Sequence, residues 1–201
     1  MKRKGIDKTT YCRIDKRNAI SKAAIELFVS NGFHGTPMSE IALRANVSPG
    51  TIYRYFESKD ALIQKLHQEL VTEIRTVIQK NYPSRKTIRE RYFHIATTLR
   101  KYFISHPLNF RYIDQYQSSP YGASSRIVLI MGSTEDYKPL KELFAEGIAK
   151  QEIRNRPLDI FVILAFCPML DLVREEVLGF ITLDDAKIMQ VAEACWSLIK
   201  T

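Results

Sequence analysis

Several protein classes are excluded by what this 201-residue sequence lacks. Its three cysteines, Cys12, Cys167 and Cys195, are far apart and have no CxxC spacing, which argues against a disulfide framework or a zinc site. We interpret Cys167 and Cys195 as buried small hydrophobes, the alternative being a redox sensor. No apolar run is long enough to span a membrane, and none follows the basic N-terminus as in a secretory signal. We therefore expect a cytoplasmic protein without a membrane partner, a metal or a cofactor.

Signals for strands and for phosphate-binding loops are missing as well. Neither period-two alternation nor a glycine-rich phosphate loop occurs, and the chain has only eight glycines. Apolar residues recur at helical spacing instead, which predicts an all-α fold. Helices are expected over residues 58–80, 86–105, 107–118, 136–150, 157–178 and 184–200, with a loop at 119–125 and a short apolar run at 126–131 that no pattern assigns.

Two short helical segments separated by a tight turn lie between residues 36 and 59. Thr36 is a candidate N-cap of the first segment, with Pro37 at the first helical position, where a missing N–H has no cost. Ser48 and Pro49 repeat the same start signals. Two capped segments of this length around a turn are typical of a helix-turn-helix.

The second of these segments has polar side chains around the apolar Ile52 and Phe56. A recognition helix brings its N-terminal end close to bases and phosphates, so it needs small residues there, followed by hydrogen-bond donors. An aromatic core stripe in the Tyr53–Phe56 run is the alternative. The predicted DNA-contacting residues are Thr36, Ser39, Ser48, Pro49, Gly50, Thr51, Tyr53, Arg54, Tyr55 and Lys59.

Spacing and residue types agree over a longer run, from Ala23 to Leu62. Its elements are an amphipathic helix ending at Asn31-Gly32-Phe33, the Thr36 start, Ile41-Ala42, Val47-Ser48, and a Tyr-x-Tyr-Phe turn leading into Ser58-Lys59-Asp60-Ala61-Leu62. This run resembles the N-terminal domain of the tetracycline-repressor-like (TetR/AcrR) transcriptional regulators. The resemblance implies a three-helix helix-turn-helix DNA-binding domain followed by a larger helical ligand-binding and dimerisation domain. Pro37 and Pro49 depart from the family, which commonly has Thr and often Lys there.

The net charge of +8 is unevenly distributed. Residues 1–60 contain eleven Lys/Arg and six Asp/Glu, a balance of +5 that leaves +3 for the rest of the chain. A basic N-terminal third is the electrostatic pattern of a DNA-binding domain. We predict a basic arm at residues 1–14, the DNA-binding domain at 15–58 and the regulatory and dimerisation domain at 59–201. The arm either contacts DNA or is a solubilising tail.

The last two expected helices are apolar on more than one face, so they need a second buried surface. Such a pair can form half of a four-helix bundle across a two-fold axis, and the family resemblance also places the dimer interface here. Pro168 is expected to kink the first of the two helices. The predicted interface residues are Phe161, Leu164, Pro168, Leu172, Glu176, Val191, Cys195 and Ile199.

Aromatic and polar residues crowd the region from Tyr92 to Tyr121. Such side chains line pockets for apolar or aromatic ligands, although ordinary core packing with tyrosine hydroxyls reaching solvent is the alternative. His94 and His106 lack the spacing of helical metal ligands. The predicted effector-binding residues are Tyr102, Phe103, His106, Phe110, Tyr112 and Tyr116.

Together these patterns predict a homodimeric transcriptional regulator, a repressor that a small apolar or aromatic effector releases from a palindromic double-stranded DNA operator. The alternative is a regulator of the same fold that responds to a protein partner or to no effector. The scattered histidines and acids offer no constellation for an enzyme.

Overall fold

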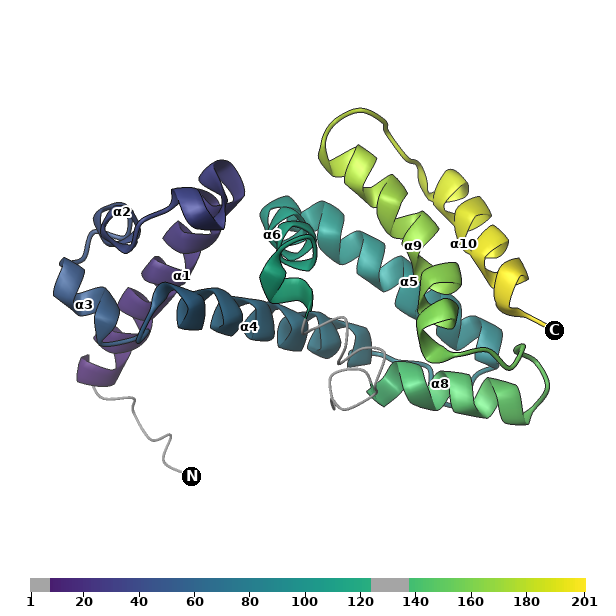
Figure 1. Cartoon of the computed structure of the whole chain (residues 1–201). Coiled ribbons are helices and arrows are strands. Elements are labelled where there is room, and N and C mark those ends of the chain that lie inside the picture. Colours follow the sequence, from purple (N-terminus) through teal and green to yellow (C-terminus); the bar gives the residue numbers. More distant parts are fainter. Residues whose placement is uncertain (1–7, 124–137) are drawn as a thin grey trace, which may run out of the picture. The chain divides into compact units, whose positions relative to one another are not determined.

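The computed structural model describes residues 8–123 and 138–201, and within them the regular structure is helical (Figure 1). The chain divides into two compact units, Met1–Glu69 and Leu70–Thr201, which we call the head and the body. The expected apolar run at 126–131 lies outside the described residues, as do the first seven residues of the predicted basic arm. None of the described helices is long and apolar enough to cross a membrane.

The head contains α1 (Lys8–Gly35), α2 (Met38–Arg44), α3 (Pro49–Tyr53) and the first half of α4 (Lys59–Gln79). Gly32, with φ 78° and ψ 164°, interrupts the helical geometry of α1, a conformation that glycine adopts without strain. Each of these helices contributes buried apolar side chains, and those of the head include Ile20, Ala24, Phe28, Phe33, Ile41, Ile52, Phe56, Leu62 and Leu66.

Thr36 does not cap α2, contrary to the expectation from sequence. The N-cap is Pro37, and α2 begins at Met38 without a side-chain cap. The Thr36 hydroxyl donates instead to the carbonyl oxygens of Leu27 (3.2 Å) and Gly32 (2.8 Å). The break of α1 at Gly32 brings these carbonyls within reach of the hydroxyl, so Thr36 secures the end of α1.

The body contains the rest of α4 together with α5, α6, α8, α9 and α10. The sequence signals placed their ends to within two residues. Residues 120–123 are helical as well, so the expectation of a loop at 119–125 was wrong there. Thr87 and Glu90 form a reciprocal capping box before α5, and the Asp184 carboxylate accepts from the Lys187 N–H before α10. The bounds are α5 Ile88–Ser105, α6 Pro107–Gln117, α8 Lys138–Ala149, α9 Leu158–Val177 and α10 Asp185–Ile199.

The core of the body forms where α5 packs against α9 and α10, which lie side by side (Figure 1). Tyr92 of α5 is buried at its centre, with its ring 5.5 Å from that of Phe166 and 5.4 Å from that of Trp196. Its hydroxyl donates to the carbonyl oxygen of Ala165 at 2.8 Å. Burial raises the pKa of Tyr92 far above its usual value, so the phenol is neutral in the folded protein.

Candidate DNA interface and regulatory sites

The start of α3 has the geometry that its sequence predicts. Ser48 is the N-cap, with φ −71° and ψ 150°, and Pro49 occupies the first helical position. The Ser48 hydroxyl pairs with the Thr51 hydroxyl at 2.8 Å and makes no capping bond to the backbone. Gly50 is exposed, and a Cβ added to it would meet no atom within 4 Å.

Two apolar side chains, one on α3 and one just after it, attach α3 to the rest of the head. Ile52 and Phe56 are buried, and the guanidinium carbon of Arg17 lies 5.6 Å from the centre of the Phe56 ring. Arg17 also forms an ion pair with Glu69 of α4. Arg17 is therefore bound to groups of its own chain, whereas Arg54, just after α3, is exposed.

Most of the predicted DNA-contacting residues are accessible. The alternative, that the aromatic residues of the Tyr53–Phe56 run belong to the core, does not hold for Tyr53, which is 55% exposed. It does hold for Phe56, which is buried. Tyr55, Thr51 and Lys59 are partly buried, and the Lys59 ammonium donates to the Thr36 carbonyl oxygen at 3.4 Å. Exposed members of the set are Ser39, Ser48, Pro49, Gly50, Tyr53 and Arg54.

Thr36 differs from the other members of this set. Its side chain is fully buried, and its hydroxyl is bonded to the α1 carbonyls. Leu43, which is 81% exposed on α2, is absent from the predicted set. Ser39 and Leu43 are four residues apart and share one face of the helix. The signal was present in the sequence, because Leu43 does not fit the apolar stripe of Ile41 and Ala42.

We expect Gly50→Ala to leave the fold intact and to weaken DNA binding several-fold. Because the φ of Gly50 is not positive and the space beside it is open, the methyl group should stabilise α3, by up to about 1 kcal/mol. On a DNA-bound protein the same methyl group would separate the backbone from the duplex. Thermal melting and fluorescence anisotropy with duplex DNA measure the two effects. Gly35→Ala is the matched control, since Gly35 has room for a methyl group and lies outside α3; equal affinities of the two variants would contradict the contact.

The predicted effector residues fall into two groups on α5 and α6. Tyr102, Phe103 and Phe110 pack with Val173 of α9 in a small buried cluster. The Tyr102 hydroxyl accepts from the Asn109 side chain at 2.9 Å, and burial raises the pKa of Tyr102 to about 12. The cluster therefore combines an apolar wall with a neutral phenol.

The other three residues of the predicted effector site are not members of this cluster. His106 is exposed, but its ring stacks on Tyr102 with centroids 4.5 Å apart. Tyr112 and Tyr116 are buried, and the Tyr116 ring lies 6.2 Å from that of Tyr121. Among the residues with described positions, no group of three or more His, Cys, Asp or Glu is arranged to hold a metal ion.

The predicted dimer residues divide between core and surface. Phe161, Cys195 and Ile199 are buried in the core of their own chain and expose almost no surface. Glu176 is also largely buried and accepts hydrogen bonds from Arg100. The remaining four, Leu164, Pro168, Leu172 and Val191, are partly or fully accessible.

Family models match both parts of the chain. The model of bacterial regulatory proteins of the tetR family matches residues 20–66, and that of the tetracyclin repressor-like C-terminal domain matches residues 87–200, more than half of the chain. The chain belongs to the tetR family of bacterial regulatory proteins. The resemblance inferred from the Ala23–Leu62 run is thereby confirmed, and the second match extends it over the body.

Individual relatives of this tetR-family chain match it in part or in full. It is 31% identical over 84 residues to a fatty acid metabolism regulator protein of Bacillus subtilis, covering 42% of each chain. It is 48% identical over 50 residues to the HTH-type transcriptional regulator UidR of Escherichia coli K12, covering 25% of this chain and 26% of UidR. The chain thus spans less than half the length of these two relatives. A tetR family transcription regulator from Shewanella sp. PV-4 has the same fold, with a TM-score of 0.82, 25% identity, and coverage of 92% of this chain and 98% of that one.

Proposed function

We propose that this protein is a transcriptional regulator that binds operator DNA through α2 and α3. The observation that carries the proposal is the division of these helices into a buried and an exposed side. Ile41 and Ile52 fix the helices in the core, while Tyr53 and Arg54 are exposed. A tyrosine hydroxyl and a guanidinium are donors that suit phosphate oxygens and base edges.

The regulator acts as a homodimer on a palindromic operator. Two recognition helices must reach successive major grooves about 34 Å apart, which requires a two-fold interface elsewhere in the chain. The accessible apolar side chains of α9 and α10, among them Ile163 and Leu198, supply a surface for it. A four-helix bundle formed by both copies of α9 and α10 would cover that surface.

The effector is a small, largely apolar molecule that binds beside Tyr102 and Phe103. The name of the Bacillus subtilis relative makes a fatty acid derivative the first candidate. An effector that binds better to the conformation with low DNA affinity releases the operator, and by linkage DNA weakens effector binding equally. A repressor would thereby be switched off. Membership in a family of regulatory proteins argues against an enzyme.

The first test is selection of bound duplexes from a random DNA library, followed by measurements with the selected operator. We expect a palindromic consensus.

The second test is binding of the effector. A long-chain fatty acid or its thioester at about 100 times its Kd should add about 2.7 kcal/mol to the free energy of unfolding, or roughly 5–10 °C to the melting temperature, and should release the operator. Operator binding that no such compound changes would favour the alternative, control by a protein partner.

A further inference from the structure

Partly accessible side chains border the buried cluster of the predicted effector site. Tyr102, Phe103 and Val173 are among its buried members. The apolar side chains that pack against the cluster from α4, α5, α6 and α9 are only partly buried, among them Ile113 of α6 and Leu170 of α9. Apolar surface of this kind suits an apolar ligand, whose orientation is then fixed by a few polar groups.

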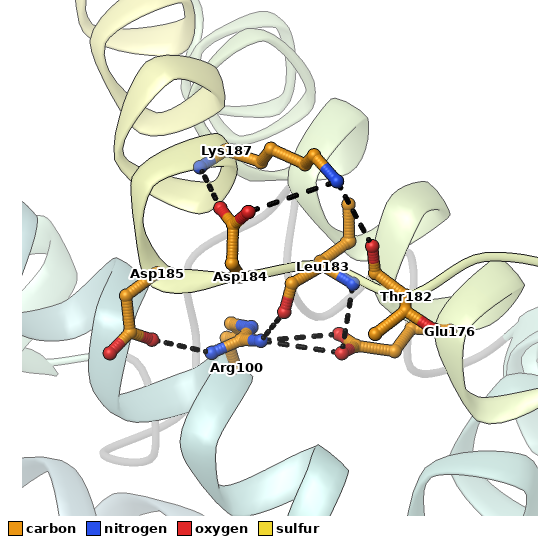
Figure 2. Close-up of polar contacts among 7 residues, drawn as sticks. All are labelled: Arg100, Glu176, Thr182, Leu183, Asp184, Asp185 and Lys187. Carbon is orange, nitrogen blue, oxygen red and sulfur yellow. Dashed lines mark hydrogen bonds and ion pairs between the residues drawn. The ribbon is translucent and has the colours of Figure 1, made fainter.

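Arg100 of α5, which follows the cluster neighbour Leu99 in sequence, is not available as such a polar group (Figure 2). Its side chain is 11% exposed and donates to the Glu176 carboxylate (3.3 Å), the Leu183 carbonyl oxygen (2.7 Å) and the Asp185 carboxylate (3.1 Å). Because the guanidinium is almost buried and bonded to three groups, a ligand can reach it only by opening the segment that connects α9 to α10.

Arg174 of α9 is the more accessible of the two guanidiniums beside the cluster. It follows Val173 in sequence, and its side chain is 38% exposed. Its Nε and one terminal nitrogen donate to the two carboxylate oxygens of Asp114 on α6, at 3.1 and 2.7 Å, and the other terminal nitrogen pairs with Asp171. The two bonds to Asp114 form a bidentate pair, the arrangement in which a guanidinium binds carboxylates in general.

The carboxylate of Asp114 lies where the head group of an amphipathic acid can bind. Ile113 and Leu170, the residues that precede Asp114 and Asp171, both pack against the apolar cluster. A molecule with a carboxylate and an apolar chain can therefore bond to Arg174 at one end and cover partly accessible apolar side chains with the other. A carboxylate tethered to the chain competes with a free one at an effective concentration that its tether sets.

We propose that Arg174 binds the carboxylate of a free fatty acid and that Asp114 competes with this carboxylate for the same guanidinium. The proposal rests on the apolar effector of the proposed function and specifies it as the acid, not the thioester. Exchange of one carboxylate for another leaves Arg174 paired, and Asp114, which is already 35% exposed, returns to water at little cost. Asp171 is 65% exposed, so solvent screens its repulsion of the ligand.

The test is isothermal titration calorimetry of the full-length protein with palmitate and with methyl palmitate, each below the concentration at which it aggregates. The wild type should bind palmitate at least about tenfold more tightly, because the ester cannot form charge-assisted hydrogen bonds. Arg174→Met should bind both compounds with equal affinity. Equal affinities in the wild type, or a preference for palmitate that survives in Arg174→Met, would overturn the proposal.

Asp114→Asn is the second test, since a competing and a merely structural carboxylate predict different results. Loss of the competitor should raise the affinity for palmitate several-fold, the scale of a partly exposed ion pair, and leave that for methyl palmitate unchanged. An affinity for palmitate that falls or stays the same would overturn the competition. Asp185→Asn is the matched control, because it also removes a carboxylate from an arginine of the body and should bind palmitate as the wild type does. An equal increase in both variants would reveal a general charge effect and overturn the proposal as well.

The results also distinguish this proposal from the proposed function. Methyl palmitate or a palmitoyl thioester that binds as tightly as palmitate and releases the operator would keep the apolar effector and overturn the carboxylate site. A wild type that binds the operator but none of these compounds would refute both. Far-UV circular dichroism of each variant checks that the chains are folded.

Discussion

Replacing Arg54 by alanine is expected to weaken operator binding by roughly 10- to 100-fold, since one good guanidinium contact to a base or phosphate is worth about 1–3 kcal/mol. Arg54 is exposed directly after α3, beside the exposed Tyr53. The affinity is measured by fluorescence anisotropy with the selected duplex at several salt concentrations. If Arg54 contacts phosphate, the slope of log K against log salt concentration should become shallower by about one unit for each protomer.

Arg17→Ala is the control that distinguishes a side chain that contacts DNA from one that only supports the position of α3. Arg17 is also a cation of the head, but its guanidinium is bonded to Glu69 and lies over the Phe56 ring. Its loss should reduce affinity by altering the support of α3, while the salt slope stays that of the wild type. A slope that is unchanged in Arg54→Ala would contradict a phosphate contact, and an affinity that is also unchanged would exclude Arg54 from the interface.

Replacing Tyr92 by alanine is expected to destabilise the body by about 3–5 kcal/mol, the usual cost of removing a fully buried aromatic ring. The ring packs between α5, α9 and α10, and the hydroxyl satisfies the Ala165 carbonyl. Trp196, the only tryptophan, lies 5.4 Å from the Tyr92 ring, so its fluorescence reports unfolding of the body in denaturant. Tyr53→Ala, which removes an exposed tyrosine, should change stability by no more than about 0.5 kcal/mol.

Tyr92→Phe isolates the hydroxyl and should cost about 1 kcal/mol, the net value of a buried hydrogen bond. It should also alter the response to alkali. The pKa of Tyr92 is raised by burial in the folded protein, so above pH 10 the unfolded chain ionises there while the folded one does not. This contribution to stability is complete below pH 10 and is lost as the pH rises. A Tyr92→Phe protein with wild-type stability and alkaline response would contradict the buried bond.

The helices could be predicted from sequence because their ends are marked by local signals. Pro107 and Asp184 fix helix starts through their own chemistry, whatever packs around them. The role of Thr36 could not be predicted, because a threonine before a proline resembles an N-cap, whereas its actual partners depend on the break at Gly32.

The surface of α9 could not be predicted for a different reason. Its sequence is apolar on most faces, so spacing alone does not distinguish the core side from the outer side. Phe161 was expected on the surface, yet its ring packs against Phe144 of α8, while Ile163 is exposed. Both outcomes depend on tertiary contacts between distant segments.

The division of α2 and α3 into a buried and an exposed side has an evolutionary consequence. The side chains that hold the head together, such as Ile41 and Ile52, are separate from those that face solvent, such as Leu43 and Arg54. Exchanges at the exposed positions should carry little cost in folding. If these exposed residues contact DNA as proposed, descendants of this chain can adopt new operators, and so control new genes, through a few surface substitutions on an unchanged scaffold.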